Sequence, residues 1–321
     1  GTTLGILLAQ NQVPVTMLAR TDAEANTLAT ERRNIRFLPD SPFPEFLTIT
    51  GQPETALKES NLVVVAVPSD RLRENMRQIT PHLRSGTIVL SATKGLELPG
   101  ARRMSQVLED ELPSTLHSGI CVLSGPNLAT EIIRGKPAST VIAGLNSEPA
   151  QRIQDALMSA SFRVYTSVDV LGVELAGALK NIVALGAGIG DGMEAGENAK
   201  AAFITRGLAE ITRLGIAAGA DPLTFAGLAG LGDVAATCSS RLSRNRFVGE
   251  QLAKGRSWDE IRESMDNVVE GVNATKAALI LAKDLGVEMP IAEMASRVLF
   301  ERLSPQKAMA ELMARPARAE W

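Results

Sequence analysis

Lys180 and Asn181 are two polar residues in the middle of a segment, 169–190, that is apolar almost all round. Such a pattern is typical of one long buried helix. At helical spacing, four of the five neighbours of the lysine are alanine or glycine: Val173, Ala176, Gly177, Ala184 and Ala187. Another group can therefore come close to this amine. Two interpretations stay open, a functional amine and a lysine whose stem packs while its amine reaches water.

Polar motifs follow three of the predicted strands, where open α/β sheets bind ligands. Val67-Pro-Ser69 follows one strand, Ser91-Ala-Thr-Lys-Gly95 follows the next, and Ser124-Gly-Pro-Asn-Leu-Ala129 follows the one after. A lysine directly after a buried strand, as Lys94 is, favours a functional role over that of a surface lysine. The glycine and proline of the third motif could equally serve the turn alone.

Three further polar groups lie in the part of the chain where helices are predicted. Asp233 and Thr237 are four residues apart, which places them on one helical face. Ser243-Arg-Asn245 begins another predicted helix, where a guanidinium and helix N-terminal amides can bind a phosphate. Glu270 stands just before the predicted helix 271–286. Asp233 and Glu270 could also be plain helix caps.

Strands and helices alternate up to about residue 167. The predicted strands cover 13–20, 61–68, 87–93, 120–124, 139–143 and 162–166, and the predicted helices cover 1–12, 22–33, 69–83, 101–111 and 148–159. This order predicts a Rossmann-type, doubly wound parallel α/β domain over residues 1–168. We expect the strand at 61–68, a run of β-branched residues, to be buried on both faces.

Strand signals nearly vanish from residue 169 onward. Helices are predicted at 170–190, 199–219, 243–255, 257–265, 271–286, 291–303 and 305–314. The sequence therefore predicts an all-helical C-terminal domain over 169–321, with the helix of Lys180 at the junction. Junctions between domains are a favoured place for small-molecule sites.

Gly1 fits the last glycine of a G-x-G-x-x-G turn, with the helix that contains Thr2 pointing its N-terminus at a pyrophosphate. We expect the first strand and the first two glycines of such a domain to be missing from this chain. Arg20 ends the strand at 13–20, where a dinucleotide-binding domain reads the ribose. An arginine there favours the 2′-phosphate of NADP, although a solvated arginine is an equal alternative.

Composition limits the class of protein. The 321 residues are 45% hydrophobic and 21% charged, as in an ordinary soluble globular protein of roughly two domains. A net charge of −3 and 3% aromatic residues argue against a nucleic-acid partner, and no uncharged apolar run predicts a membrane span. Cys121 and Cys238 lie far apart, which predicts no metal site and a reduced cytoplasmic chain. His82 and His117 are the only histidines, so chemistry that usually uses histidine must use another group.

These motifs together resemble the bacterial NAD(P)-dependent glycerol-3-phosphate dehydrogenases. The resemblance rests on motifs in family order along nearly the whole chain: Val67-Pro-Ser, Ser91-Ala-Thr-Lys-Gly-Leu-Glu, Ser124-Gly-Pro-Asn-Leu-Ala-Thr-Glu, Gly172-Val-Glu-Leu-Ala-Gly-Ala-Leu-Lys-Asn, 192–201, Gly230-Leu-Gly-Asp, Ser243-Arg-Asn-Arg and Val269-Glu-Gly. It implies a Rossmann-type domain, a helical domain and reversible reduction of dihydroxyacetone phosphate to sn-glycerol 3-phosphate. It also implies a place in glycerophospholipid synthesis. Arg20 makes NADP the expected preferred cofactor, with NAD as an alternative, and a homodimer is one option for the assembly.

The resemblance also implies roles for individual residues. Lys180 matches the family's catalytic acid/base, Lys94 matches the lysine near the reacting carbonyl, and Asp233 completes the catalytic group. Substrate contacts are implied at Lys94, Gly125, Asn127, Asn181, Asp233, Thr237, Ser243, Arg244 and Asn245. Cofactor contacts are implied at Gly1, Thr2, Arg20, Lys94, Ala129, Arg244, Val268 and Glu270. The chain departs from the family in two ways. Asn127 stands where Ser or Thr is more usual, and the aromatic residue that family members carry before the position of Gly1 is absent.

For ketone reduction a lysine must then supply the proton, and an unperturbed amine with a pKa of roughly 10.4 is a poor source at neutral pH. We expect burial and Lys94 to lower the pKa of Lys180 and Asp233 to oppose that change. A rival interpretation is a hydroxyacid dehydrogenase of similar plan, acting on a 3-hydroxy acid or 6-phosphogluconate. The motifs around Lys94 and Arg244 argue against it. A second rival is a cofactor-binding regulator without activity, which the joint presence of Lys94, Lys180, Asp233 and Arg244 disfavours.

Overall fold

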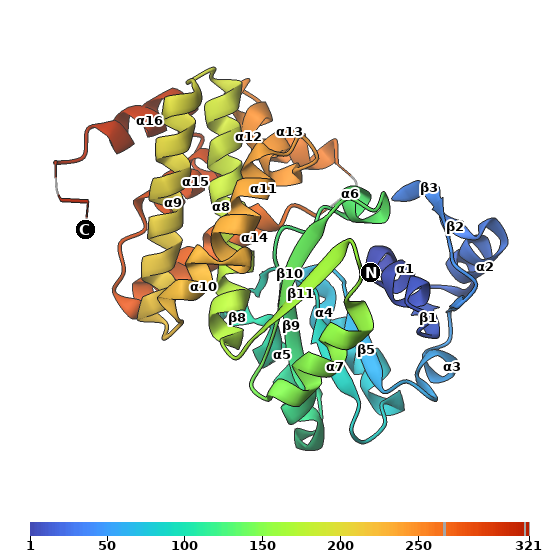
Figure 1. The fold of residues 1–321 in the computed structure, drawn as a ribbon. Helices are drawn as coiled ribbons and strands as arrows, with labels where there is room; N and C mark the ends of the chain where they lie inside the picture. Colours follow the sequence, from blue (N-terminus) through green and yellow to red (C-terminus); the bar gives the residue numbers. More distant parts are fainter. Residues whose placement is uncertain (266–267, 318, 321) are drawn as a thin grey trace. The chain divides into compact units, whose positions relative to one another are not determined.

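The computed structural model describes residues 1–265, 268–317 and 319–320 (Figure 1). The chain divides into two compact units. The first is Gly1–Thr93 with Arg103–Glu174, and the second is Lys94–Arg102 with Leu175–Trp321. The short segment that begins at Lys94 thus belongs to the second unit, although its sequence lies between two predicted elements of the first. The division also falls inside the long predicted helix rather than just before it.

A five-stranded sheet forms the centre of the first unit, with the strand order β11-β10-β9-β6-β5. Its strands are β5 (Leu62–Val65), β6 (Ile88–Ser91), β9 (Ile120–Ser124), β10 (Ala138–Gly144) and β11 (Phe162–Ser167). Strands β5, β6 and β9 are parallel, and β11 is parallel to β10, but β10 runs antiparallel to β9. The predicted Rossmann-type domain is thus confirmed, with a mixed rather than purely parallel sheet. Antiparallel neighbours need no full crossover helix, and only the short α6 (Ala129–Ile133) lies between β9 and β10.

Shorter strands pair outside this sheet. Strand β1 (Val15–Leu18) pairs in parallel with β4 (Leu47–Thr50), β2 (Arg33–Asn34) pairs with β3 (Leu38–Pro42), and β7 (Leu96–Glu97) pairs with β8 (Arg102–Arg103). Only β1 was expected from the sequence, because strands as short as β2, β7 and β8 show no alternation or β-branched run.

Strand β5 is less buried than its sequence suggests. It lies at the end of the strand order, and its Leu62 and Val64 are half-buried. Every residue of β6 and β9 is buried instead. The expectation that the strand at 61–68 is buried on both faces was therefore wrong.

Helices cover both faces of the central sheet. Within β6, Val89 packs in one hydrophobic cluster with residues of α4 and α5, whereas Leu90 packs in another with residues of α1 and α7. Consecutive strand residues point to opposite faces, so these clusters lie on opposite sides, as in a doubly wound domain. The helices are α1 (Thr2–Gln10), α2 (Asp22–Glu31), α3 (Pro53–Leu57), α4 (Leu72–Ile79), α5 (Met104–Glu111), α6 and α7 (Ser147–Leu157), with 3₁₀ turns at Ser69–Arg71, Thr80–His82 and Ser114–Gly119.

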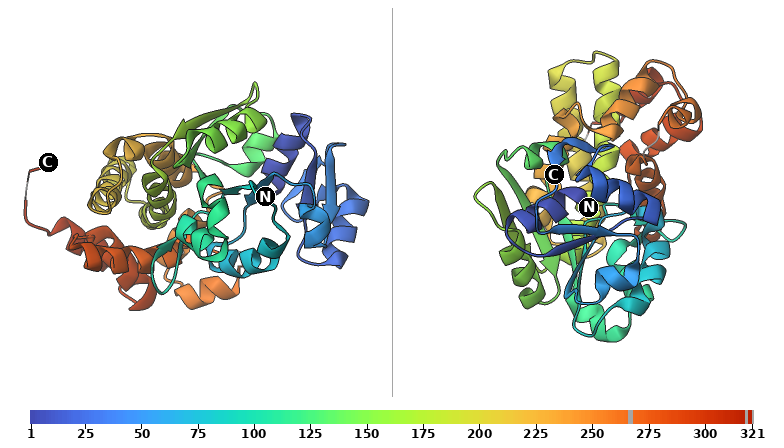
Figure 2. Two further views of the ribbon diagram at one scale, coloured as in Figure 1. Left: turned by 90° about the horizontal axis from the view of Figure 1, so that it is seen from below. Right: turned by 90° about the vertical axis from the view of Figure 1, so that its right-hand side faces the viewer.

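The second unit is built from helices. They are α8 (Val170–Gly192), α9 (Glu197–Ala217), α10 (Pro222–Ala226), α11 (Asp233–Ser239), α12 (Arg244–Ala253), α13 (Trp258–Glu263), α14 (Glu270–Leu285), α15 (Pro290–Phe300) and α16 (Pro305–Met313), with a π-helical turn at Leu228–Gly232. Helices α8 and α9 lie side by side in all three views (Figures 1 and 2). Every helix predicted beyond residue 169 is present, with ends shifted by up to three residues.

Helix α8 is the central helix of this unit. It is long and apolar enough to cross a membrane by length and composition, but 89% of its apolar window is buried inside the protein. Helix α12 packs directly on its backbone, because a Cβ atom added to Gly249 would lie 2.0 Å from the Leu185 carbonyl oxygen. This close crossing brings the start of α12 towards the polar residues in the middle of α8.

Candidate active site

A buried aspartate and two lysines form the centre of the second unit. The Lys180 Nζ donates to Asp233 Oδ1 and, at 2.7 Å, to Thr237 Oγ1. The Lys94 Nζ donates to Asp233 Oδ2 at 2.6 Å. The Lys180 and Asp233 side chains are 8% and 2% exposed, whereas that of Lys94 is 21% exposed. One carboxylate therefore holds two ammonium groups, of which Lys94 is the more open to solvent.

The electrostatics of this cluster set the protonation of Lys180. Burial lowers the pKa of Lys180, the positive charge of Lys94 lowers it further, and Asp233 opposes both, with a net pKa of about 8. Burial alone would raise the pKa of Asp233, but the two ammonium groups outweigh it and hold that pKa below its usual value. Lys180 can thus both lose and regain a proton near neutral pH, which a lysine of ordinary pKa does poorly.

Local sequence explains how Asp233 and Thr237 reach the amine. Both lie on α11, and their spacing of four residues puts the Thr237 hydroxyl 3.2 Å from Asp233 Oδ1. Asp233 is the first residue of α11 and does not occupy the N-cap position, which belongs to Gly232. The plain-cap alternative for Asp233 was therefore wrong, and its carboxylate is engaged by the two lysines.

A chain of amides joins Asn181 to the starts of α12 and α14. The Asn245 Nδ2 donates to Asn181 Oδ1 at 2.8 Å, and Asn245 Oδ1 accepts from the Gly271 N–H at 3.0 Å. A Cβ at residue 271 would lie 2.7 Å from Asn245 Oδ1, so only glycine allows this approach. The Asn245 carboxamide is therefore largely committed to positioning its neighbours.

Arg244 holds the segment before α14. Its Nη1 donates to the Val268 carbonyl at 2.8 Å. Ser243 is the N-cap of α12 and accepts from the Arg246 N–H at 3.3 Å, as its place at a predicted helix start suggested. Glu270 is the first residue of α14 and follows the N-cap Val269. The structure thus brings together Lys94, Lys180, Asp233 and Thr237 in one group, and Asn181, Asn245 and Gly271 in a second that shares α8 with the first.

The remaining predicted residues lie in the first unit. Gly1 is the N-cap of α1, and the Thr2 hydroxyl accepts from Asn34 Nδ2 at 3.0 Å. Arg20 lies just beyond β1, and its guanidinium pairs with Glu24 Oε2 at 3.0 Å. Because the N-cap of α1 is a glycine, no side chain caps the first N–H groups of this helix, and they are available to an anion.

Gly125, Asn127 and Ala129 follow β9 in the same unit. Gly125 has a φ of +134°, a conformation that favours glycine. Asn127 Nδ2 donates to Thr140 Oγ1 at 2.9 Å, while its Oδ1 is buried without a hydrogen-bond partner. Ala129 is the first residue of α6. The carboxamide at 127 therefore keeps one acceptor that a ligand donor could satisfy.

Comparison with known proteins shows the family to which this chain belongs. Residues 1–150 match the family model for the N-terminus of NAD-dependent glycerol-3-phosphate dehydrogenase, and residues 169–310 match that for its C-terminus. The chain belongs to the NAD-dependent glycerol-3-phosphate dehydrogenase family. The resemblance stated from the sequence is thereby confirmed, and the chain is an NAD(P)-dependent oxidoreductase.

Relatives in this family cover the chain fully. The chain is 50% identical over 321 residues to glycerol-3-phosphate dehydrogenase (NAD(P)+) of Dehalococcoides mccartyi, a match covering 100% of the chain and 89% of the relative. It is 44% identical to the enzyme of the same name from Chlorobium limicola, covering 100% of the chain and 96% of the relative. A crystal structure of glycerol-3-phosphate dehydrogenase from Coxiella burnetii matches with a TM-score of 0.91 at 36% identity, covering 98% of the chain and 95% of that structure.

Two residues beside the predicted dehydrogenase site were missed from the sequence. Glu24 lies four residues after Arg20 on a predicted helix, a spacing that signals an ion pair. Gly271 lies in the quoted motif Val269-Glu-Gly, but only the structure shows why it must be glycine.

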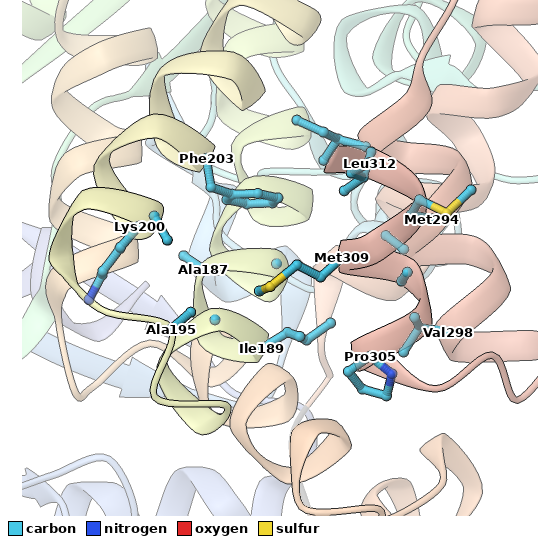
Figure 3. Close-up of a pocket in the computed structure, with 16 residues that line it drawn as sticks. Ala187, Ile189, Ala195, Lys200, Phe203, Met294, Val298, Pro305, Met309 and Leu312 are labelled. Carbon is cyan, nitrogen blue, oxygen red and sulfur yellow. The ribbon is translucent and has the colours of Figure 1, made fainter. Parts of the chain in front are cut away.

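The second unit also contains an apolar cavity of about 80 Å³ between α8, α9, α15 and α16 (Figure 3). Phe203, Met309 and Leu312 line it, and its one charged lining residue, Lys200, pairs with Asp191 at 2.9 Å. The lining side chains are otherwise apolar, and the one charged group among them is held in an ion pair.

Proposed function

We propose that this chain catalyses the reversible, NAD(P)H-dependent reduction of dihydroxyacetone phosphate to sn-glycerol 3-phosphate. The observation that carries the proposal is the pair of lysines, buried Lys180 and half-buried Lys94, on the Asp233 carboxylate in a chain that belongs to the glycerol-3-phosphate dehydrogenase family. Reduction of a ketone needs a proton donor at the carbonyl oxygen, and Lys180 is a donor whose pKa of about 8 suits neutral pH. The bound cofactor supplies or accepts the hydride.

Each residue of the cluster takes one role in this proposal. Lys180 is the general acid for reduction and the general base for oxidation, worth roughly 10²–10⁴ in rate. The ammonium of Lys94 stabilises negative charge that develops on the carbonyl oxygen. Asp233 and Thr237 hold the Lys180 amine in place, since both contact its Nζ. Their contacts keep the proton at one defined atom.

The second group of residues binds the substrate in this proposal. Asn181 is adjacent to Lys180 on α8, and Arg244 and Ser243 begin α12, where a guanidinium and free backbone amides suit a phosphate. Asn245 positions Asn181 through its own carboxamide. Gly125 and Asn127 of the first unit contribute further substrate contacts. Fixing the phosphate orients the carbonyl carbon and so removes part of the entropic cost of the reaction.

The cofactor contacts and cellular setting are part of the same proposal. Gly1 and Thr2 at the start of α1 receive the pyrophosphate, and Arg20 receives the 2′-phosphate, so NADPH is preferred to NADH. Ala129, Val268, Glu270, Lys94 and Arg244 complete the cofactor contacts. The enzyme works in the cytoplasm, as a homodimer, and feeds glycerophospholipid synthesis.

An assay of cofactor oxidation tests the proposal. NADPH and NADH oxidation is followed with dihydroxyacetone phosphate, with 2-keto and 3-keto acids, and with 6-phosphogluconate in the reverse direction. Turnover with dihydroxyacetone phosphate alone is expected, because Arg244 and Ser243 recognise a phosphate beside a short ketone. Turnover only with the carboxylate substrates would overturn it in favour of a hydroxyacid dehydrogenase. Binding of cofactor with no turnover on any of them would favour a regulator without activity.

A further inference from the structure

Arg20 and Glu24 form an exposed ion pair where β1 leads into α2. The Arg20 Nε and Nη2 donate to Glu24 Oε2 and Oε1, each at 3.0 Å, and the Arg20 backbone N–H donates to Oε2 at 3.2 Å. The Arg20 and Glu24 side chains are 77% and 36% exposed. Thr21, the N-cap of α2, accepts from the Glu24 N–H at 3.1 Å and so fixes the first turn of the helix. The Nε–Nη2 edge of the guanidinium, which could bind a phosphate through two hydrogen bonds, is therefore occupied by the Glu24 carboxylate.

The place of this pair in the fold points to the cofactor. In a dinucleotide-binding domain, the residue after the second strand reads the ribose, an acid by binding its 2′-hydroxyl and an arginine by binding a 2′-phosphate. Here an acid and an arginine stand at that place together and neutralise each other. We propose that Glu24 is a specificity-determining residue that lets one site take both NADH and NADPH, by releasing Arg20 when a 2′-phosphate arrives. The inference rests on the proposed dependence on NAD(P)H.

The chemistry of each state follows from the charges. With NADH, the Glu24 carboxylate stays on Arg20 and offers its remaining lone pairs to the ribose 2′-hydroxyl. With NADPH, the carboxylate repels the 2′-phosphate, which takes over the guanidinium of Arg20. Arg36, which helps to lower the pKa of Glu24, supplies a second cation near the displaced carboxylate. That pKa lies below its ordinary value, chiefly through the hydrogen bond from Arg20, so Glu24 carries its charge at neutral pH.

The exposure of the pair decides how strongly it favours one cofactor. A solvent-exposed ion pair adds little stability, so displacing Glu24 weakens NADPH binding by no more than about fivefold. A buried pair would instead exclude one of the two cofactors. The weak pair accounts for a site that accepts both, with Glu24 moderating the preference that Arg20 alone would impose.

Binding measurements on the full chain without any ketone substrate test the inference. Dissociation constants of NADPH, NADH, 2′,5′-ADP and 5′-AMP are measured by calorimetry for the wild type and Glu24→Gln. The variant should bind NADPH and 2′,5′-ADP about three- to fivefold more tightly, because Arg20 is freed. It should bind NADH more weakly, since a neutral amide is a poorer acceptor for the 2′-hydroxyl, so the ratio of the two constants should shift by about tenfold.

Glu31→Gln is the matched control, because Glu31 lies at the other end of α2 and is exposed. The same loss of charge there should leave the ratio unchanged. Arg20→Gln should reduce binding of 2′,5′-ADP to that of 5′-AMP. Equal ratios in Glu24→Gln and Glu31→Gln, or undiminished 2′,5′-ADP binding in Arg20→Gln, would overturn the inference. A wild type that binds both cofactors but does not reduce dihydroxyacetone phosphate would instead contradict the proposed reaction and leave the binding result standing.

Discussion

Asp233 and Glu210 are two buried carboxylates of the same helical unit with opposite behaviour. Asp233 is 2% exposed and Glu210, on α9, is 3% exposed. Two ammonium groups hold the pKa of Asp233 below its usual value, despite its burial. Burial raises the pKa of Glu210 to about 7, although its carboxylate accepts the backbone N–H groups of Ile291 and Ala292, each at 2.9 Å, and Arg213 also acts to lower that pKa. Equal burial therefore leaves the Asp233 carboxylate charged at pH 7 and the Glu210 carboxyl about half protonated.

The difference shows what each region does. Glu210 ties α9 to the first turn of α15, where unpaired helix N–H groups attract a carboxylate, and this is a structural contact. The Asp233 region gathers three charges in a small volume, which is costly unless each is matched. Such an arrangement with a perturbed amine is typical of a catalytic site. Removing the charges of Asp233, Lys180 and Glu210 in turn should therefore have different effects in the two regions.

The largest effect is expected from removing the amine of the Asp233 region. Lys180→Met should lower kcat for reduction of dihydroxyacetone phosphate by about 10²–10⁴, because the proton donor is lost. Lys283→Met, at an exposed site in the last turn of α14, is the control and should keep wild-type turnover. Steady-state rates with saturating NADPH provide the measurement. Wild-type turnover in Lys180→Met would show that the lysine cluster is structural, like Glu210.

Removing the carboxylate of the same region should cost stability. Asp233→Asn leaves the Lys180 amine buried beside Lys94 without its counter-charge, so the free energy of unfolding should fall by about 3–5 kcal/mol. Urea unfolding at pH 7 measures it. Because the double variant Lys180→Met, Asp233→Asn removes both charges, it should recover most of the loss. Additive losses in the double variant would mean that Asp233 does not stabilise Lys180.

Much of the Asp233 region could be predicted from the sequence. The small-residue face of α8 indicated that something comes close to Lys180, and the spacing of Asp233 and Thr237 put them on one helical face. The family resemblance implied that Asp233, Thr237 and Lys94 belong to the same site as Lys180, but only the structure shows that Asp233 and Thr237 contact the Lys180 amine. The ion pair between Lys94 and Asp233 joins residues 139 positions apart, a contact that no local sequence pattern encodes.

The parts that were not predicted have a common physical cause. Strand β4 and the reversal of β10 depend on pairing with other segments of the chain, and tertiary contacts override local propensity there. Strands β2 and β3 pair with each other locally, but β2 is too short to show a strand pattern. The role of Glu210 could not be foreseen either, because a glutamate in the middle of α9 looks like any solvated helix residue. Only the packing of α15 against it shows that it is buried.

The pH dependence of activity should report the Asp233 region. With a pKa of about 8, Lys180 is protonated below that pH and can act as the acid for reduction. The rate of reduction should therefore fall by about tenfold per pH unit above pH 8, and that of oxidation should rise up to pH 8 and then level off. Profiles of kcat in both directions, with Lys180→Arg for comparison, check this. A flat profile from pH 6 to 10 would contradict a titrating lysine.

The smallest effect, and the one that completes the contrast, is expected at Glu210. Its pKa is raised on folding from 4.5 to about 7, so the folded state binds more protons and the group's contribution is fully present below pH 4.5. That contribution is lost as the pH rises through 7, and stability should fall by about 2 kcal/mol between pH 5.5 and 7.5. Glu210→Gln, which cannot ionise, should remove this dependence, as measured by urea unfolding at both pH values, whereas Glu288→Gln, exposed ahead of α15, should keep it. If the free energy of unfolding of Glu210→Gln changed with pH as much as that of the wild type, the wild-type carboxylate would ionise freely despite its burial. The two regions would then not differ in the way their charges are matched.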